Sequence, residues 1–316
     1  MNSPVTEIRS VPAVAVGGAS SAATRAPAPP AYIQGTTLLY PVIGCPVAQV
    51  QAPMLYNALF SATGIDVAVV PVEISPADYP SVLRALFRAH NVPGAMITIP
   101  HKSPTVALLD SCSDAVRIAG ACNAVVRRAD GSLHGDLFDG LGLVRAVTHQ
   151  GLRVAGARCL VVGSGGAGAA IAAALATAGA ATVQVSDFLP SQSAALAARL
   201  GQHFPNVDVR AGDAAPDGFS LVVNATPLGM RDDDALPIDV SRLAPSTFVA
   251  EIVMKRDITP LVAAARGLGC RTMLGREMLQ AQMPLYLEFF GLDRASAAPG
   301  SRDHANDRDG ATAAGG

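Results

Sequence analysis

The chain contains no tryptophan, few aromatic residues (4%) and few charged residues (15%) among its 316 residues. The shortage of aromatic side chains argues against a surface that stacks nucleic-acid bases. A formal net charge of −2 argues against an electrostatically bound nucleic acid and against a wholly disordered chain, because both need far more uncompensated charge. No apolar run approaches the roughly 18 residues of a membrane-spanning helix. We therefore expect neither a nucleic acid nor a membrane as a partner.

Patterns typical of disulfides and metal sites are also missing. The five cysteines are scattered, and none forms a C-x-x-C pair or stands near a histidine at metal-ligand spacing. The start of the chain lacks the charged segment and continuous apolar stretch of a secretory signal peptide. We therefore expect no metal, no disulfide framework and a reducing, cytoplasmic location.

Lysine is scarce as well, because 21 of the 23 basic residues are arginine and only Lys102 and Lys255 are lysine. Arginine serves a solvated surface well, but its very high pKa makes it a poor proton donor or acceptor. Each remaining lysine is therefore a candidate for proton chemistry, although codon bias alone would also explain the excess of arginine.

Half of the residues are apolar, and a chain of this length favours two domains over one. Residues 1–34 and 294–316 are rich in small residues and lack periodicity, which predicts disordered tails. Between the tails, strands alternate with helices, so we expect an α/β fold with mainly parallel, helix-covered sheets. We place the domain boundary near 150–157, which gives a first domain over 35–150 and a second from 151 to about 275.

The apolar patterns predict the individual elements of both halves. In the first half we expect a helix over Ala77–His90 and a hairpin formed by Ala124–Arg127 and Ser132–His134. In the second half we expect strands Arg158–Val162, Thr182–Ser186 and Leu221–Asn224, with helices Gly166–Ala178 and Ser191–Leu200 between them.

A glycine-rich stretch follows the first strand of the second half and fits the pattern G-x-G-x-x-G. Its cofactor-binding candidates are Gly163, Gly165, Gly166, Ala167 and Gly168. Glycines at these positions permit a tight turn, close approach of the backbone to a pyrophosphate, and close packing of the helix on the sheet. The N-terminus of the helix adds N–H donors for phosphate oxygens. Close packing alone also favours glycine at the start of a helix, so this pattern by itself is weak evidence for a dinucleotide site.

Asp187 gives a second signal, because it follows Gly168 by 19 residues at the end of the next predicted strand. A carboxylate at this place accepts hydrogen bonds from the adenosine ribose and repels a 2′-phosphate. No arginine or lysine stands beside it, so we expect NAD as the preferred cofactor, with NADP possible. The alternative is an ordinary acidic residue ahead of a helix.

Asn224, Ala225 and Thr226 begin a loop, N-A-T-P-L-G-M, at the end of another predicted strand. Ligands of open α/β sheets lie at the carboxyl ends of the strands, so we expect this loop to border the nicotinamide end of the cofactor. The alternative is a turn that simply ends the strand, which Asn, Pro and Gly also favour.

Five short motifs occur in collinear order between about residues 40 and 292. They are I-P-H-K at 99–102, G-A-x-N at 120–123, the G-S-G-G-A-G loop at 163–168, N-A-T-x-x-G-M at 224–230 and M-L-x-x-Q at 278–282. In this combination the chain resembles the shikimate/quinate dehydrogenase family. The resemblance implies oxidation of a ring hydroxyl with NAD(P) in a cleft between an N-terminal substrate domain and a C-terminal Rossmann-type domain. It also implies that the last helix, about 276–293, returns to the first domain.

The resemblance assigns roles to single residues. Lys102 and Asp139 match the family's catalytic pair, in which lysine relays the proton of the reacting hydroxyl. Thr98, Asn123 and Gln282 match positions that bind substrate hydroxyls. Gly275, just before the last motif, is a further cofactor-binding candidate. His101, beside Lys102, is expected to be structural, and Lys255 is expected to be a surface charge.

The chain departs from the family where the substrate carboxylate is held. The family loop H-S-x-S-P is here Gln49-Val50-Gln51-Ala52-Pro53, so both serine hydroxyls are absent. Losing two hydrogen bonds to a charged group costs roughly 3–6 kcal/mol if nothing replaces them. We therefore expect poor activity on shikimate, with Gln49, Gln51 or Arg256 contacting a different substituent. Further departures are Met96, Leu137, Phe138, Met254 and Arg256.

Three functions remain open at this point. The first is a cytoplasmic dehydrogenase acting on a small cyclic hydroxy compound related to shikimate or quinate. The second is a dinucleotide-binding sensor with degraded catalysis, which the loss of the serines favours and the intact Lys102 and Asp139 oppose. The third is a true shikimate dehydrogenase of aromatic amino-acid biosynthesis in which other groups hold the carboxylate. The sequence is compatible with a monomer or a homodimer.

Overall fold

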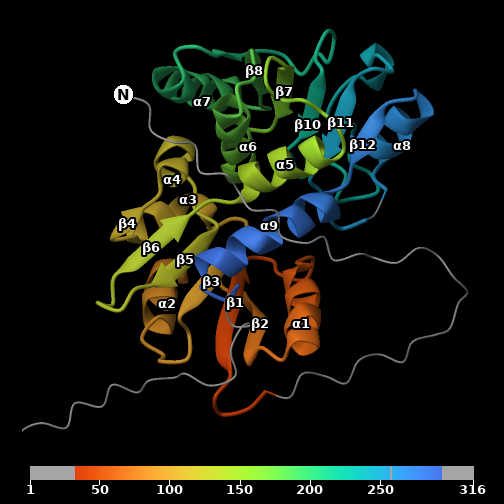
Figure 1. Ribbon diagram of the computed structural model, residues 1–316. Coiled ribbons are helices and arrows are strands. Elements are labelled where there is room, and N and C mark those ends of the chain that lie inside the picture. The colour runs from red at the N-terminus through yellow and green to blue at the C-terminus, as the bar shows by residue number, and fades with distance from the viewer. Residues whose placement is uncertain (1–32, 257, 294–316) are drawn as a thin grey trace, which may run out of the picture. The chain divides into compact units, whose positions relative to one another are not determined.

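The computed structural model describes residues 33–256 and 258–293 (Figure 1). The predicted tails at 1–34 and 294–316 lie outside this range, except for Ile33 and Gln34, which have no regular secondary structure. None of the helices in the described residues is long and apolar enough to cross a membrane.

The first half of the chain forms a mixed six-stranded sheet with the order β2-β1-β3-β5-β6-β4. Its strands are β1 (Leu38–Gly44), β2 (Val67–Glu73), β3 (Gly94–Ile97), β4 (Ser111–Cys112), β5 (Ala124–Arg127) and β6 (Leu133–Asp136). Strand β1 pairs in parallel on both sides, with β2 and β3, and a strand in that position is expected to be apolar throughout. The predicted hairpin is present as β5 and β6, which pair antiparallel.

Four short helices accompany this sheet: α1 (Ala52–Thr63), α2 (Tyr79–Leu86), α3 (Lys102–Thr105) and α4 (Asp114–Ala119). A single 3₁₀ turn, η1 (Val106–Leu108), follows α3. Helix α1 has a proline in its first turn and ends before Gly64, whose φ of 70° lies in the left-handed region that glycine adopts freely. Helix α2 is shorter than the predicted Ala77–His90. Its end tightens into i→i+3 bonds from Arg88 N to Ala85 O and from Ala89 N to Leu86 O, both 3.0 Å, which close the last turn.

The second half forms a six-stranded sheet with the order β12-β11-β10-β7-β8-β9, in which every pair is parallel. Its strands are β7 (Arg158–Val162), β8 (Thr182–Ser186), β9 (Asp208–Ala211), β10 (Leu221–Asn224), β11 (Phe248–Glu251) and β12 (Arg271–Met273). The strand order reverses between β7 and β10. In doubly wound sheets this point opens the crevice that binds ligands. The predicted α/β fold with a Rossmann-type second sheet is thus confirmed.

The remaining helices are α5 (Asp139–His149), α6 (Gly166–Thr177), α7 (Pro190–His203), α8 (Pro260–Gly267) and α9 (Gly275–Phe289), with a 3₁₀ turn η2 (Val240–Arg242). Helices α5 and α9 pack against each other (Figure 1). Leu285 and Tyr286 of α9 belong to a buried cluster with Tyr40 of β1 and Phe60 of α1. The last helix therefore follows the second sheet in sequence but packs on the first.

The segment between the two sheets is part of the core rather than a free linker. Leu152, Val154 and Ala157 are buried and belong to a cluster that contains side chains of both halves, such as Leu83 and Ile171. The two halves of the chain therefore share one hydrophobic core.

Candidate active site

A cavity of about 690 Å³ is lined by residues from both sheets and from α1, α3, α5 and α9. Its volume lies within the range of roughly 300–1,000 Å³ typical of small-molecule sites. Strands β3, β7, β10 and β11 all end at this cavity, since residues directly after each of them line it: Thr98, Gly163, Ala225 and Ile252.

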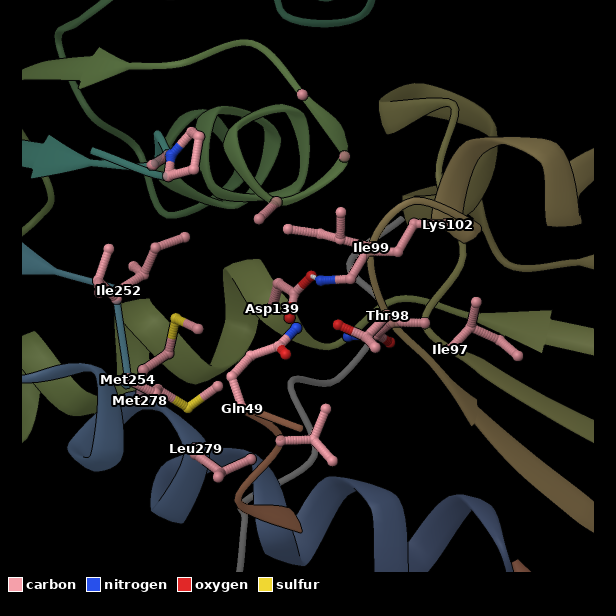
Figure 2. A pocket seen from close by; sticks show the side chains of 18 of the residues that line it. Gln49, Ile97, Thr98, Ile99, Lys102, Asp139, Ile252, Met254, Met278 and Leu279 are labelled. Atoms are coloured by element: carbon pink, nitrogen blue, oxygen red, sulfur yellow. Dashed lines mark hydrogen bonds and ion pairs between the residues drawn. The ribbon is translucent and has the colours of Figure 1, made fainter. Parts of the chain in front are cut away.

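Lys102 and Asp139 form an ion pair in the wall of this cavity, with side chains 12% and 6% exposed. Each is the first residue of its helix, Lys102 of α3 and Asp139 of α5. Figure 2 shows the two side chains directed toward one another, with Thr98 and Ile99 on the same side and Met254, Met278 and Leu279 on the other. The sequence therefore brings together a proton-carrying amine and a carboxylate that lie 37 residues apart.

Gln282 adds a third element to this pair. Its side chain is 3% exposed, lies on α9, and donates from Nε2 to Oδ1 of Asp139 at 3.4 Å. The lysine contacts the other carboxylate oxygen, Oδ2. The Asp139 carboxylate is thus fixed from two sides, by α3 and by α9.

The Asn123 side chain is buried next to this cluster, and only one of the two polar atoms of its amide forms a hydrogen bond with the described residues. Its Oδ1 accepts a hydrogen bond from the backbone N of Phe138 at 3.0 Å, whereas its Nδ2 has no partner among the described residues. Thr98 lines the cavity beside it and is held by its backbone N, which donates to Ile43 O at 2.8 Å.

The loop that precedes α1 gives the cavity an apolar edge. Val50 and Ala52 line the cavity, so the positions where the family carries serine present only methyl groups. Gln49 and Gln51 also line it, but the Gln49 side chain is turned back on its own loop, where Nε2 donates to Pro46 O at 2.8 Å.

The glycine-rich loop has the geometry that a pyrophosphate-binding turn needs. Gly163 has φ +105°, and a Cβ there would lie 2.7 Å from Ala225 O. A Cβ on Gly168 would lie 1.9 Å from Gly163 O, so α6 begins in direct contact with the turn. Both positions therefore require glycine.

Gly165, Gly166 and Ala167 line the cavity, and a Cβ on Gly165 would meet nothing within 4 Å. The backbone at the N-terminus of α6 is thus open to a ligand, as a dinucleotide pyrophosphate requires. The residues present fit such a cofactor.

Asp187 also lines the cavity, at the end of β8. Its Oδ2 accepts from Ser164 N (2.7 Å) and Ser164 Oγ (2.5 Å), and its Oδ1 accepts from Leu189 N (3.0 Å). Partial burial raises the pKa of this carboxyl, but the hydrogen bonds from Ser164 and Leu189 together lower it below its usual value. The group is therefore a stable anion that ties the glycine-rich loop to the neighbouring strand.

Asn224 lies behind the cavity rather than in its lining. It forms hydrogen bonds with Glu251, a buried residue for which the sequence predicted no role. Its Nδ2 donates to both oxygens of Glu251, at 3.0 and 3.1 Å, while its Oδ1 accepts from Thr226 Oγ1 at 2.7 Å. Thr259 Oγ1 and Val253 N also donate to Glu251. Burial raises the pKa of Glu251 above its usual value, and these hydrogen bonds oppose the rise. The network fixes Ala225 and Thr226, which do line the cavity.

Other predicted residues fall at or outside the edge of the cavity. Gly275 begins α9 where a Cβ would lie 2.7 Å from Val253 O, and it does not line the cavity. Lys255 is exposed at the edge. Arg256 forms an ion pair with Asp232 and does not contribute to the lining. His101 is buried, stacked on Tyr79 at 4.0 Å with its Nε2 against Ile74 O.

Residues that sequence reasoning missed include Glu251 and Tyr56, both buried, of which Tyr56 lines the cavity. For Glu251 a signal existed, since an acidic residue at the end of an apolar strand demands partners. No such signal existed for Tyr56, because an aromatic residue on an amphipathic helix is most often part of the core.

Comparison with known proteins places the chain in a family. Residues 42–125 match the model of the shikimate dehydrogenase substrate binding domain. A shikimate dehydrogenase (NADP(+)) from Rubrobacter xylanophilus is 38% identical over 254 residues, which cover 79% of this chain and 89% of the relative.

Two solved structures are also similar. One is shikimate 5-dehydrogenase from Listeria monocytogenes in complex with shikimate and NAD (26% identity, TM-score 0.74, covering 82% of this chain and 93% of the other). The other is the ligand-free 5-ketofructose reductase of Gluconobacter sp. strain CHM43 (26% identity, TM-score 0.73, covering 80% and 92%). The chain therefore belongs to the shikimate/quinate dehydrogenase family, as its motifs predicted, and is a dehydrogenase acting on a CH–OH group.

Proposed function

We propose that the chain catalyses reversible, NAD(P)-dependent oxidation of a ring hydroxyl in a small cyclic compound of the shikimate type. The observation that carries this proposal is the buried Lys102–Asp139 pair, which lies in the wall of one cavity with the glycine-rich loop of the second sheet. A proton-transfer group beside an open dinucleotide loop is the arrangement that a CH–OH dehydrogenase needs.

In this proposal Lys102 Nζ contacts the oxygen of the reacting hydroxyl and relays its proton. The neutral amine takes the proton during oxidation, and the ammonium returns a proton to the oxygen in the reverse reaction. A bound nicotinamide dinucleotide would accept the hydride from the carbon that carries this oxygen. Asp139 holds the amine in place and accepts a hydrogen bond from a neighbouring hydroxyl, while Gln282 fixes Asp139 through Oδ1. Thr98 and Asn123 orient the ring from the first sheet.

This assignment also divides the chain. We propose that residues 35–150 bind the substrate, that residues 151–275 bind the dinucleotide, and that residues 276–293 serve the substrate side through Gln282. Gly163, Gly165, Gly166, Ala167 and Gly168 would hold the pyrophosphate, with Ala225 and Thr226 beside the nicotinamide. Asn224 and Gly275 would support these contacts from behind the lining.

We further propose that NAD is preferred over NADP. Asp187 is anionic at the end of β8, and the side chains after it are Phe188, Leu189 and Pro190, none of which is a cation that would hold a 2′-phosphate. A relative whose name specifies NADP(+) favours the opposite preference. The preference for NAD is therefore tested by direct measurement.

For Asp187→Asn we expect the ratio of kcat/KM with NAD to kcat/KM with NADP to fall roughly tenfold, because removal of a charge beside the 2′-phosphate changes the binding free energy by about 1.4 kcal/mol. Steady-state kinetics with both dinucleotides measure this ratio. Glu288→Gln is the matched control, since it removes an equal charge from an exposed position on α9. Equal efficiencies of the unmodified protein with both cofactors would contradict the preference.

The apolar loop before α1 points to a substrate other than shikimate. Val50→Ser with Ala52→Ser restores two hydroxyls at the cavity edge. We expect this double variant to raise kcat/KM for shikimate by roughly 10²- to 10⁴-fold, since two hydrogen bonds to a charged group contribute about 1.5–3 kcal/mol each. Initial rates of dinucleotide reduction with shikimate measure the change, and Val47→Ser, in the same loop but outside the lining, controls for polarity.

A second candidate is true shikimate dehydrogenase, which the 38% identity to an enzyme of that name favours. In that case the unmodified protein turns over shikimate efficiently, the double serine variant is no better, and the gene rescues growth of a strain that lacks the biosynthetic step. The ketose reductase among the similar structures favours the opposite outcome, a substrate without a carboxylate.

Two further proposals concern the cellular location and the oligomeric state of the enzyme. The five cysteines are all free thiols, at positions 45, 112, 122, 159 and 270, which suits a reducing compartment. We therefore propose a cytoplasmic location and activity as a monomer or a homodimer.

A further inference from the structure

Two buried polar atoms in the cavity wall have no hydrogen-bond partner in the part of the chain that the structure describes. They are the hydroxyl of Tyr56 and Nδ2 of Asn123. Both side chains line the cavity, and both residues are 1% exposed. Because a buried polar group without a partner is destabilising, two such groups in one cavity wall indicate that a ligand completes them.

The position of Tyr56 explains why it reaches the cavity. Ala52, Tyr56 and Phe60 are the buried residues of α1, so they lie one turn apart on the same face. Side chains on a helix lean toward its N-terminus, and the N-terminus of α1 borders the cavity. The Tyr56 ring therefore extends over Ala52, where the serine hydroxyl of the family is missing.

Tyr56 and Asn123 both contact a common neighbour, Tyr286, which also lines the cavity. The rings of Tyr56 and Tyr286 pack edge to face with centroids 6.2 Å apart, and the Tyr286 hydroxyl donates to the backbone O of Asn123 at 3.2 Å. Tyr286 thus uses its own hydroxyl internally and holds the other two residues in place.

The two free groups have the same chemical character. Burial raises the pKa of the Tyr56 phenol, so it keeps its proton, and Nδ2 of Asn123 carries only N–H donors. Their surroundings include Val50, Ala52 and Met96, and the described lining residues include no arginine.

The two lysines of the lining are Lys102, which is paired with Asp139, and Lys255, which is exposed. A carboxylate buried beside Tyr56 would therefore have no unpaired buried cation in the described part of the cavity wall, which is costly. An uncharged oxygen would be satisfied by two neutral donors.

We infer that Tyr56 is a further substrate-binding residue, and that its hydroxyl and the Asn123 amide form a subsite for one uncharged hydroxyl or carbonyl oxygen of the substrate. This inference rests on the proposed dehydrogenase function and specifies its substrate as neutral on the side that faces α1. The serine hydroxyl that the family carries at the position of Ala52 is thus replaced by the Tyr56 hydroxyl, one turn further along α1.

The test compares shikimate with its methyl ester, which keeps the ring hydroxyls and removes the charge. We expect the unmodified protein to use the ester with at least roughly tenfold higher kcat/KM. In Tyr56→Phe we expect KM for the ester to rise roughly 3- to 10-fold, the effect of one neutral hydrogen bond. The kcat should stay within about twofold, and the melting temperature should not fall, because no protein partner is lost.

Tyr40→Phe is the matched control. Tyr40 is buried in the same cluster as Tyr56, but it does not line the cavity, so KM should not change. An unchanged KM in Tyr56→Phe would overturn the inference and leave the proposed function intact. A preference for shikimate over the ester would overturn it too, since the subsite would then hold a carboxylate. Absence of turnover with both compounds would overturn the inference as well, and the proposed function fails with it if no other cyclic hydroxy compound is turned over.

Discussion

Replacing Lys102 by arginine is expected to lower kcat by roughly 10²- to 10⁴-fold, the usual contribution of general acid–base catalysis. Arginine keeps the positive charge beside Asp139 and so preserves the ion pair. It cannot exchange a proton near neutral pH because its pKa is too high. The variant therefore separates proton transfer from simple electrostatic pairing.

Two comparisons sharpen this experiment. Lys102→Ala should lose as much activity as Lys102→Arg, while dinucleotide affinity, measured by calorimetry, should be little changed in both. Lys255→Arg is the matched control, since Lys255 is the other lysine of the chain and is exposed. If Lys102→Arg kept most of its activity while Lys102→Ala did not, Lys102 would act only through its charge.

Replacing Gly168 by alanine is expected to lower the free energy of unfolding by about 1–3 kcal/mol, because overpacking at a rigid contact forces the backbone to shift. The added methyl would lie 1.9 Å from the carbonyl oxygen of Gly163. Since that carbonyl belongs to the turn of the glycine-rich loop, the shift also reaches Gly165, which is open to the cavity. We therefore expect dinucleotide affinity to fall at least roughly tenfold, or about 1.4 kcal/mol.

Gly201→Ala is the matched control for this substitution. Gly201 also lies within a helix, α7, but a Cβ there would meet nothing within 4 Å. Alanine should raise stability at this position by about 0.5–1 kcal/mol, because glycine has a low helix propensity. Denaturant unfolding of both variants checks the opposite signs, and equal effects would contradict the assigned role of Gly168.

Three inner strands of the second sheet could be predicted closely from the sequence, whereas its edge strands β9 and β12 were not predicted. The strands Arg158–Val162, Thr182–Ser186 and Leu221–Asn224 have the predicted bounds. Buried parallel strands are continuous apolar runs, and the glycines or polar residues that follow them mark their ends clearly. The same regularity made the dinucleotide loop and Asp187 visible, because their spacing is fixed by one strand–helix–strand unit.

Short elements and long-range contacts could not be predicted in the same way. Strand β4 has two residues and α4 has six, which is too short for a periodic pattern. The contact between Gln282 and Asp139 joins residues 143 positions apart. The family resemblance assigned both residues to the site but did not predict that they touch. Tyr56 was not predicted because nothing in the sequence shows that its buried hydroxyl lacks a hydrogen-bond partner among the described residues.

The measurement that tests the account most directly is the rate of dinucleotide reduction by the purified protein with shikimate, quinate and neutral cyclic hydroxy compounds, run beside Lys102→Ala. We predict turnover of at least one neutral compound by the unmodified protein and a loss of roughly 10²-fold or more in the variant. Equal turnover by Lys102→Ala, or tight dinucleotide binding without turnover of any compound, would contradict the account.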